Sequence, residues 1–531
     1  MISGDGEFLV GTSESKAQGF AVATPHSYAT EIAVGVLKKG GSAADAAIAA
    51  AAVLCVIYPQ DCALGGDLVA LLHRKNGSFT SLLSVGSTSM NADVKAVRSE
   101  CAQMPQTGPL TVTVPGLVAG LGELHNAAGR LPWAELLAPA VKTATSGVRM
   151  SEATARFLAE GWPQFSQDEG MRSVFGDRKG TPLKIGDLLV QRALGETLTK
   201  LAELGSKEFY SGSVAVNLAS GMSNLGIQID ETDLMSHEAE WKNALSVRFA
   251  GKQVYTSPPT TQGFIFLCIL KALERINFDI HSGTESQGDL VNLSASAAGF
   301  QDEYWGEWVG SQTQDINEAW IDGFAAKLST SMASTEQQDS HKWGGDTVAI
   351  VIRDSEGDAV TLIQSLSMPF GAGLLDPKTG IIFHNRGASF TLKPNKINTL
   401  GPGRRPPHTL MPVMVAEAGS LRGLLGTMGG KSQPQILLQV LIRLLAQDSV
   451  QNAVSAPRWV LGGRVPTPDI FTLTVEPGLE KLSRQMSEEG WSVDKLDAPS
   501  DNVGHAQVIW LGEKTWDAAS DPRSDGSAIA W

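Results

Sequence analysis

A threonine directly after a polar, glycine-marked segment could serve as the nucleophile of this chain. Thr347 follows Gly344-Gly345-Asp346, and the residues after it are almost all apolar. A threonine hydroxyl is a poor nucleophile unless a base removes its proton, and one compact solution uses the residue's own free α-amine. That solution requires an N-terminal threonine. We therefore predict that the backbone breaks between Asp346 and Thr347, by attack of the Thr347 hydroxyl on the preceding carbonyl.

The motif around Thr347 also has a purely structural explanation, because a threonine often begins a strand. Two features support the chemical interpretation. Gly344 and Gly345 allow backbone geometries that are closed to other residues, and the strand that follows would anchor the nucleophile. On this motif alone, the structural explanation is the commoner one.

A second glycine pair could stabilise the negative charge that such a reaction develops. Gly429-Gly430 follows a predicted strand and precedes a predicted helix. Backbone N–H groups at such a turn can form an oxyanion hole for a tetrahedral intermediate. The alternative is a turn that needs glycine for close packing. Gly65-Gly66 has the same two interpretations, and there we favour packing.

The nucleophile would be held by a hairpin of apolar strands. Residues 347–353 and 359–366 are apolar at nearly every position, and the polar run 354–358 connects them. Such strands suit a sheet that is covered on both faces. Residues 68–72 and 80–85 predict an earlier hairpin. Further strands are predicted at residues 254–256, 381–384, 421–430 and 506–510.

Two helices near the N-terminus should pack close together. Ala29–Lys39 has helical periodicity and stops at Gly40-Gly41, and Ser42 can cap the next helix with Asp45 in its first turn. This second helix is so rich in alanine that another segment must approach its backbone closely. Further helices are predicted at residues 190–204, 264–276 and 433–447. Helices and strands alternate in blocks, which favours a layered α/β architecture.

The composition excludes several classes of partner. The 531 residues are 42% hydrophobic and 18% charged, an ordinary globular composition. A net charge of -14 with a pI near 5.2 argues against nucleic acid or an anionic membrane surface and favours a small-molecule ligand. The four cysteines form no CxxC pair, and the nine histidines form no HExxH pattern. We therefore predict no metal and no cofactor.

Further expectations concern location and the segment before Thr347. The first 20 residues lack the apolar region of a secretory signal, and the longest apolar run, Ala46–Tyr58, has 13 residues. That run is too short for the ~20 residues that span a bilayer. We expect a cytoplasmic protein with no membrane partner. Ser329–Lys342 is poor in apolar residues and is predicted to be a solvated linker.

Ordered motifs along nearly the whole chain resemble the γ-glutamyltranspeptidase family of N-terminal-nucleophile hydrolases. The most specific are Gly345-Asp346-Thr347, Phe370-Gly371-Ala372-Gly373, Pro406-Pro407-His408-Thr409-Leu410-Met411-Pro412 and Gly426-Thr427-Met428-Gly429-Gly430. Their combination makes the catalytic interpretation of Thr347 the favoured one. The resemblance implies that Ser365 is a second hydroxyl beside the nucleophile and that Gly429-Gly430 forms the oxyanion hole.

The resemblance also implies an architecture and a mature form. The fold would be α/β, a four-layer αββα sandwich of the N-terminal-nucleophile hydrolase type. Cleavage before Thr347 would leave a large subunit of residues 1–346 and a small subunit of residues 347–531, which together form one intertwined domain. The mature protein would be a heterodimer of these fragments, and a dimer of heterodimers is an open alternative.

Several positions of the expected pocket depart from the glutathione-cleaving pattern of the family. The loop Ser84–Ser89 lacks the arginine that holds the α-carboxylate of a γ-glutamyl group. Ser389 stands where that pattern has the acid that takes the α-amine, and Arg386 where it has Gln or Glu. Ser367 replaces a pocket asparagine, and His408-Thr409 replaces a Ser-Ser pair.

These departures predict a substrate that bears a carboxylate but no amine, because an ammonium buried without a partner is costly. Arg386, with Thr409 or His408, would orient the carboxylate, while Thr347 forms an acyl-enzyme that water hydrolyses. Arg386 could instead be structural, and His408 a core histidine. The run Asn385–Ala388 resembles the acylase-like and oxamate-amidohydrolase-like branches. Two alternatives stay open: genuine γ-glutamyl hydrolysis or transfer, and a silent binding or scaffold member, against which the retained catalytic set argues.

Overall fold

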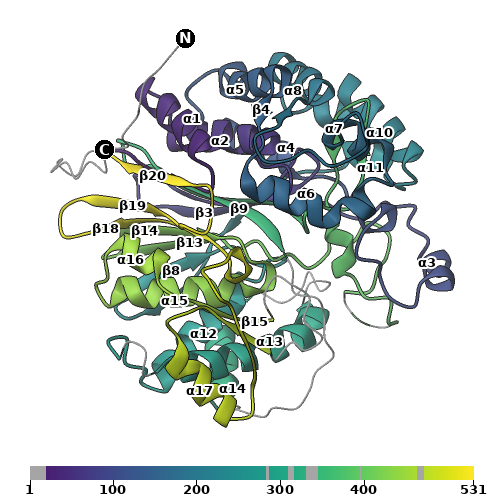
Figure 1. Ribbon diagram of the computed structural model, residues 1–531. Coiled ribbons are helices and arrows are strands. Elements are labelled where there is room, and N and C mark those ends of the chain that lie inside the picture. Colours follow the sequence, from purple (N-terminus) through teal and green to yellow (C-terminus); the bar gives the residue numbers. More distant parts are fainter. Residues whose placement is uncertain are drawn as a thin grey trace.

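Two antiparallel sheets hold the strands that the sequence marks as buried (Figure 1). The computed structural model describes residues 19–282, 286–308, 316–330, 345–394, 396, 398–462 and 472–531, with the backbone alone at 300–308. The larger sheet has the order β20-β1-β9-β10-β2-β3-β6, with bounds Ser527–Ala530, Ala21–Thr24, Asp346–Arg353, Ala359–Ser367, Asp67–His73, Phe79–Ser84 and Glu240–Asn243. The smaller sheet has the order β19-β18-β14-β13-β8-β7, with bounds Trp516–Ser520, Ala506–Leu511, Ser420–Thr427, Val413–Glu417, Lys252–Thr256 and Leu245–Phe249.

The central strand β9 turns one face to helices and the other to the second sheet. Val348 lies in the same buried cluster as the helix α2 (Ala43–Ile57). Val351, on the opposite face, packs in a cluster with Met414 of β13. Because side chains alternate along a strand, Thr347 has the parity of Val351 and lies on the face toward the smaller sheet. The nucleophile position is therefore at one end of the space between the sheets.

Helices cover the outer face of each sheet. In Figure 1 the purple and blue helices lie in the upper part, beyond the larger sheet, and the green helices lie in the lower part, beyond the smaller sheet. The first group includes α1 (Ser27–Lys38), α2, α4 (Leu117–Ala128), α5 (Trp133–Ser146) and α8 (Arg192–Leu204). The second group includes α12 (Gly263–Arg275), α13 (Gln287–Trp308), α14 (Glu318–Thr330) and α15 (Gln433–Leu445).

The remaining elements are short or peripheral. The helices are α3 (Val94–Glu100), α6 (Glu152–Phe165), α7 (Glu169–Phe175), α9 (Glu208–Ser211), α10 (Ser213–Asn224), α11 (Glu231–Met235), α16 (Val450–Ser455) and α17 (Glu480–Glu488). The strands are β4 (Val148–Arg149), β5 (Leu188–Leu189), β11 (Leu375–Asp376), β12 (Ile381–Ile382), β15 (Trp459–Leu461), β16 (Thr472–Val475) and β17 (Ser492–Lys495).

The alanine-rich helix α2 is approached closely by the central hairpin, as predicted. All of its residues are buried, and the carbonyl of Ala51 accepts a hydrogen bond at 3.1 Å from Nε2 of Gln364 in β10. Its start is also as predicted: Ser42 and Asp45 form a capping box. The preceding Gly40 has φ +88, which explains the glycine at the end of α1.

Most predicted elements are present, with one correction. Both predicted hairpins form, as β2 with β3 and β9 with β10. The strand predicted at 381–384 is only β12, which pairs with β11 outside the two large sheets, because the chain turns away at Phe383 to carry His384 toward β2. Most of the linker predicted at 329–342 lies outside the described residues. In the part of the chain that the structure describes, each helix is too short or too polar to cross a membrane.

Candidate active site

Thr347 meets Ser365 at an irregular point of the central hairpin. The register between β9 and β10 shifts between Gln364 and Ser367, which marks a β-bulge. At this bulge Thr347 Oγ1 donates a hydrogen bond to Ser365 Oγ at 3.1 Å. Both side chains are buried. The structure therefore brings together the two hydroxyls that the sequence singled out.

The Ser365 hydroxyl also contacts the peptide bond that we predict to break. Ser365 Oγ donates to the carbonyl oxygen of Asp346 and accepts the backbone N–H of Ser367 at 2.8 Å. A donor on the carbonyl oxygen favours attack at the carbonyl carbon, because it stabilises the negative charge that develops on oxygen. The Thr347 hydroxyl belongs to the adjacent residue, so the arrangement suits an intramolecular attack on the Asp346 carbonyl.

The second glycine pair lies against the segment that leads to the nucleophile. Gly429 and Gly430 have φ values of +132 and +54, which favour glycine. The backbone of Gly345 is so close that an added Cβ would lie 2.8 Å from Gly430 N. Gln262, after β8, donates from Nε2 to the carbonyls of Gly430 at 2.8 Å and of Thr409 at 2.7 Å. One amide therefore joins the glycine pair to the loop before β13.

A buried carboxylate stands opposite Ser365 in the neighbouring strand. Asp67 pairs with Ser365 in the β2–β10 register. Asp67 Oδ2 lies 3.0 Å from His408 Nε2 and 3.3 Å from His384 Nδ1, and Oδ1 accepts two backbone N–H groups. Burial would raise the pKa of Asp67, but the two histidines outweigh it and hold the pKa well below its usual range. Asp67 is therefore ionised, and both of its oxygens are engaged.

The second charge of the site is the guanidinium of Arg386, which begins the short helix η2 (Arg386–Ser389). The side chain is 3% exposed, and Nη2 donates to Thr409 Oγ1 at 3.1 Å. Burial lowers the pKa of Arg386 to about 10, against the attraction of Asp67, so the group stays protonated at neutral pH. Among the described residues, no carboxylate forms an ion pair with this guanidinium. A buried cation without a bonded anion is costly, so an anionic ligand would be stabilised strongly here.

His408, the other proposed carboxylate partner, is fully used by the protein. Its Nε2 lies against Asp67, and its Nδ1 accepts the backbone N–H of Leu410 at 3.4 Å. Burial, and then the positive charge of Arg386, lower the pKa of His408 to about 4. The ring is therefore neutral at pH 7, and its contacts favour the alternative of a core histidine that supports Thr409.

The two serines that replace family pocket residues lie at the edge of this group. Ser367 and Ser389 are half-buried, Ser367 at the end of β10 and Ser389 at the end of η2. Ser367 contributes its backbone N–H to Ser365, and its φ of +81 reflects the bulge. The glycines at Gly65-Gly66 serve packing, as favoured: a Cβ added at Gly66 would lie 2.6 Å from the Ser365 carbonyl oxygen.

Three residues of the site were missed by sequence reasoning. Asp67 follows the Gly-Gly turn at the start of a buried strand, and a charge at such a position is the one signal that could have been noticed. His384 falls at the end of the strand predicted at residues 381–384, and Gln262 falls between the strand predicted at 254–256 and the helix predicted at 264–276. Neither carries a local signal, because their partners are distant in sequence and meet them only through the packing of the sheets.

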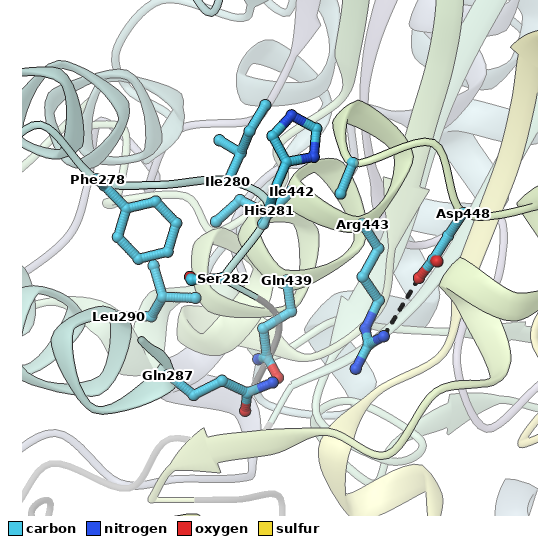
Figure 2. Close-up of a pocket in the computed structure, with 11 residues that line it drawn as sticks. Phe278, Ile280, His281, Ser282, Gln287, Leu290, Gln439, Ile442, Arg443 and Asp448 are labelled. Carbon is cyan, nitrogen blue, oxygen red and sulfur yellow. Dashed lines mark hydrogen bonds and ion pairs between the residues drawn. The ribbon is translucent and has the colours of Figure 1, made fainter. Parts of the chain in front are cut away.

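The structure also has a cavity of about 250 Å³, and Figure 2 shows the side chains that line it. It is bounded by the loop after α12, by α13 and by α15, and its lining includes Phe278, Leu290, Gln439, Ile442 and Arg443. None of the residues of the candidate site lines it. In the uncleaved chain the Thr347 and Ser365 side chains are buried instead of lining this cavity.

Known proteins match the chain along its length. The gamma-glutamyltranspeptidase family matches residues 29–531. The glutathione hydrolase-like YwrD proenzyme of Bacillus subtilis is 31% identical over 516 residues, 96% of this chain and 98% of that protein. The oxamate amidohydrolase proenzyme of Klebsiella pneumoniae is 31% identical over 531 residues, 98% of this chain and all of that protein (100%). A crystal structure of a cephalosporin acylase from Bacillus halodurans has a TM-score of 0.87 at 27% identity and covers 100% of this chain and 99% of its own.

Proposed function

Because the chain belongs to the γ-glutamyltranspeptidase family of N-terminal-nucleophile hydrolases, we propose that it is a self-processing amidohydrolase for small amides whose acyl group bears a carboxylate but no amine. The layers of helices, larger sheet, smaller sheet and helices support the proposal that the fold is the four-layer αββα sandwich. Residues 1–346 and 347–531 would be the two subunits of one intertwined domain.

Processing would begin at the bond that Ser365 contacts. The Thr347 hydroxyl attacks the Asp346 carbonyl carbon, and the Ser365 hydroxyl stabilises the developing oxyanion. The peptide bond to the Thr347 nitrogen breaks as an ester to Thr347 Oγ1 forms, and water then hydrolyses this ester. The products are a new carboxylate on Asp346 and a free α-amine on Thr347.

Catalysis would use the same hydroxyl on an external amide. The α-amine of Thr347 accepts the hydroxyl proton while Oγ1 attacks the amide carbonyl, and the N–H groups of Gly429 and Gly430 stabilise the oxyanion. The leaving amine takes a proton as the acyl-enzyme forms. Water, activated by the same α-amine, releases the acid.

The proposed substrate class rests on the guanidinium of Arg386, which is buried and makes one hydrogen bond, to Thr409. A substrate carboxylate bound to this guanidinium would supply the anion that the described part of the chain does not provide. The nearby carboxylate of Asp67 has both oxygens engaged and so is not free to accept the ammonium of a γ-glutamyl group. Oxamate-type and acylase-type substrates therefore fit this proposal better than glutathione does, and the names of two relatives support the same class.

A substrate panel tests the proposal directly. Processed enzyme is assayed with oxamate, glutaryl amides and γ-glutamyl-p-nitroanilide, and kcat/KM is compared. We expect the first two to be preferred. Several relatives have names that contain glutathione hydrolase, which favours γ-glutamyl activity instead. A dominant γ-glutamyl activity would overturn the assignment of the pocket.

A further inference from the structure

The side-chain amide of Gln262 joins two parts of the candidate site that are far apart in the chain. Gln262 is fully buried and lies directly before α12. Its Nε2 donates hydrogen bonds to the carbonyl oxygen of Thr409 at 2.7 Å and to that of Gly430 at 2.8 Å. A primary amide has two N–H groups, so each carbonyl can accept one of them. The two carbonyls therefore cannot move apart unless one of these hydrogen bonds breaks.

Each of the two carbonyls belongs to a residue that is part of, or bonded to, one of the proposed anion-binding groups. Thr409 accepts a hydrogen bond from Arg386, the guanidinium proposed for the acyl carboxylate. Gly429 and Gly430 form the proposed oxyanion hole, which would receive the carbonyl oxygen of the amide. A continuous series of contacts thus runs from the carboxylate-binding group through Thr409 and Gln262 to the oxyanion hole.

The loop before β13, which holds the hydrogen-bond partner of the guanidinium, has further support from the segment that carries Gln262. The backbone N–H of His408 donates to the carbonyl oxygen of Thr260 at 3.0 Å, and Thr256 Oγ1 donates to that of Pro412 at 2.9 Å. These two hydrogen bonds tie the loop to β8 and to the residues that follow β8, whether or not the Gln262 amide is present. A change of that amide should therefore leave this loop in place.

The opposite end of the series is a glycine turn that depends on contacts from outside. Gly429 and Gly430 have φ values of +132 and +54 and no side chains, so their backbone has many accessible conformations. Gly345 packs closely against this turn, but cleavage before Thr347 would place Gly345 next to a free chain end. The hydrogen bond from Gln262 does not depend on that end. In the processed protein it would hold the oxyanion hole at its distance from the guanidinium.

We propose that Gln262 is a positioning residue that sets the spacing between Arg386 and the oxyanion hole, and that this spacing selects the length of the acyl chain. The inference rests on the proposed function in placing the two ends of the acyl group on these two sites. An acyl group of matching length puts its carboxylate on the guanidinium and its carbonyl oxygen on the glycine N–H groups at the same time. A shorter or longer chain reaches only one of them, so its carbonyl is poorly placed for attack by Thr347.

The first test measures the chain-length preference of the wild-type processed enzyme. Values of kcat/KM are determined for the monoamides of unbranched dicarboxylic acids, from oxamate to adipamate. Since a misplacement of about 1 Å can cost roughly 10²-fold in rate, we expect one preferred length and a fall of about tenfold or more for chains that differ from it by two methylenes. A profile that is flat over the whole series would overturn the proposal.

A variant of Gln262 separates positioning from simple stabilisation. Gln262→Met keeps the length of the side chain but has no N–H donor. We expect kcat for the preferred monoamide to fall by about tenfold or more with little change in KM, because the oxyanion forms only in the transition state. Monoamides of other lengths should lose less, so the profile of kcat/KM against chain length flattens.

Gln439→Met is the matched control. Gln439 is also buried, and its Nε2 also donates to two carbonyls, that of Gln435 at 3.1 Å and that of Trp459 at 2.8 Å. It is not part of the candidate site. This variant should lose a similar amount of stability in urea unfolding and keep the wild-type profile. If Gln262→Met instead slows the hydrolysis of all lengths by the same factor, its role is structural and the proposal is refuted.

Binding of the product acids distinguishes this inference from the proposed function. Calorimetry gives the Kd of the dicarboxylates from oxalate to adipate for the same preparations. If their binding depends on length and Gln262→Met removes that dependence, while no monoamide is hydrolysed, the proposed activity fails and the inference stands. If monoamides are hydrolysed with a length profile that Gln262→Met leaves unchanged, the activity stands and the inference fails.

Gln262→Asn is the second variant, for the case that Gln262→Met does not undergo processing. Its amide is one methylene shorter and reaches only one of the two carbonyls, so we expect the same flattened profile. If neither variant is processed while Gln439→Met is, Gln262 serves processing instead of chain-length selection, and the inference fails.

Discussion

Replacing Arg386 with glutamine should weaken the use of anionic substrates without destabilising the protein. The guanidinium is 3% exposed and makes one hydrogen bond, to Thr409, so a substrate carboxylate would meet it with little screening by water. Truncation of one partner in a buried, hydrogen-bonded charge pair costs roughly 2–5 kcal/mol. A value of about 3 kcal/mol corresponds to a loss of about 150-fold in kcat/KM for an anionic amide. An uncharged amide should lose far less.

Stability provides the second half of this prediction. Removing an arginine that pairs with a buried carboxylate costs roughly 3–5 kcal/mol of stability, because the carboxylate is left without its partner. Arg458 offers the matched control, because it is also buried but pairs with Asp521. Urea unfolding should therefore show a large decrease in the free energy of unfolding for Arg458→Gln and little change for Arg386→Gln. The reasoning is refuted if Arg386→Gln unfolds as easily as the control, or if it slows anionic and uncharged amides equally.

Four further outcomes follow from the site. A denaturing gel of wild-type protein should show fragments of about 37 and 20 kDa, by proportional length, whereas Thr347→Ala should stay a single 56.2 kDa chain; cleavage of that variant would exclude Thr347 as nucleophile. Ser365→Ala should slow processing by about 10²–10³-fold, as loss of an oxyanion donor does, and a wild-type time course would contradict this. Gly345→Ala should also slow processing, since the added Cβ would lie 2.8 Å from a backbone nitrogen, while Gly35→Ala, whose added Cβ meets nothing within 4 Å, should process normally. Burial lowers the pKa of His408 to about 4, so below about pH 6.5 the unfolded chain binds a proton at this residue before the folded chain does. The free energy of unfolding therefore has its full value above that pH and should fall by about 2 kcal/mol between pH 7 and pH 5. Urea unfolding of His408→Gln should show a smaller drop.

The fold was predictable where the sequence pattern is local. The capping box of α2 depends only on Ser42 and Asp45, which are three residues apart. The glycine after α1 is explained by a single positive φ angle. The hairpin around β9 and β10 could be predicted because both strands are apolar on both faces, which only a covered sheet satisfies. The strand expected at 381–384 was predicted only in part, because apolar residues next to a turn do not reveal which partner strand is available.

The candidate site was predictable only in part. Thr347 and its glycine-marked approach are contiguous, and Ser365 lies in the strand that returns beside them, so sequence motifs could place both. The β-bulge that brings their oxygens within 3.1 Å is a feature of strand pairing and has no signal of its own. Gln262, which joins the loop before β13 to the second glycine pair, depends on the packing of three distant segments.

The sequence by itself therefore predicted the nucleophile, the strand that carries it and the departures from the γ-glutamyl pocket pattern. Tertiary structure alone decided the electrostatics. Asp67 is far in the chain from the segment that holds both His384 and Arg386, and only the tertiary packing buries the three residues together. Protonation and charge preference depend on distance and on exclusion of water, which no local pattern of residues encodes.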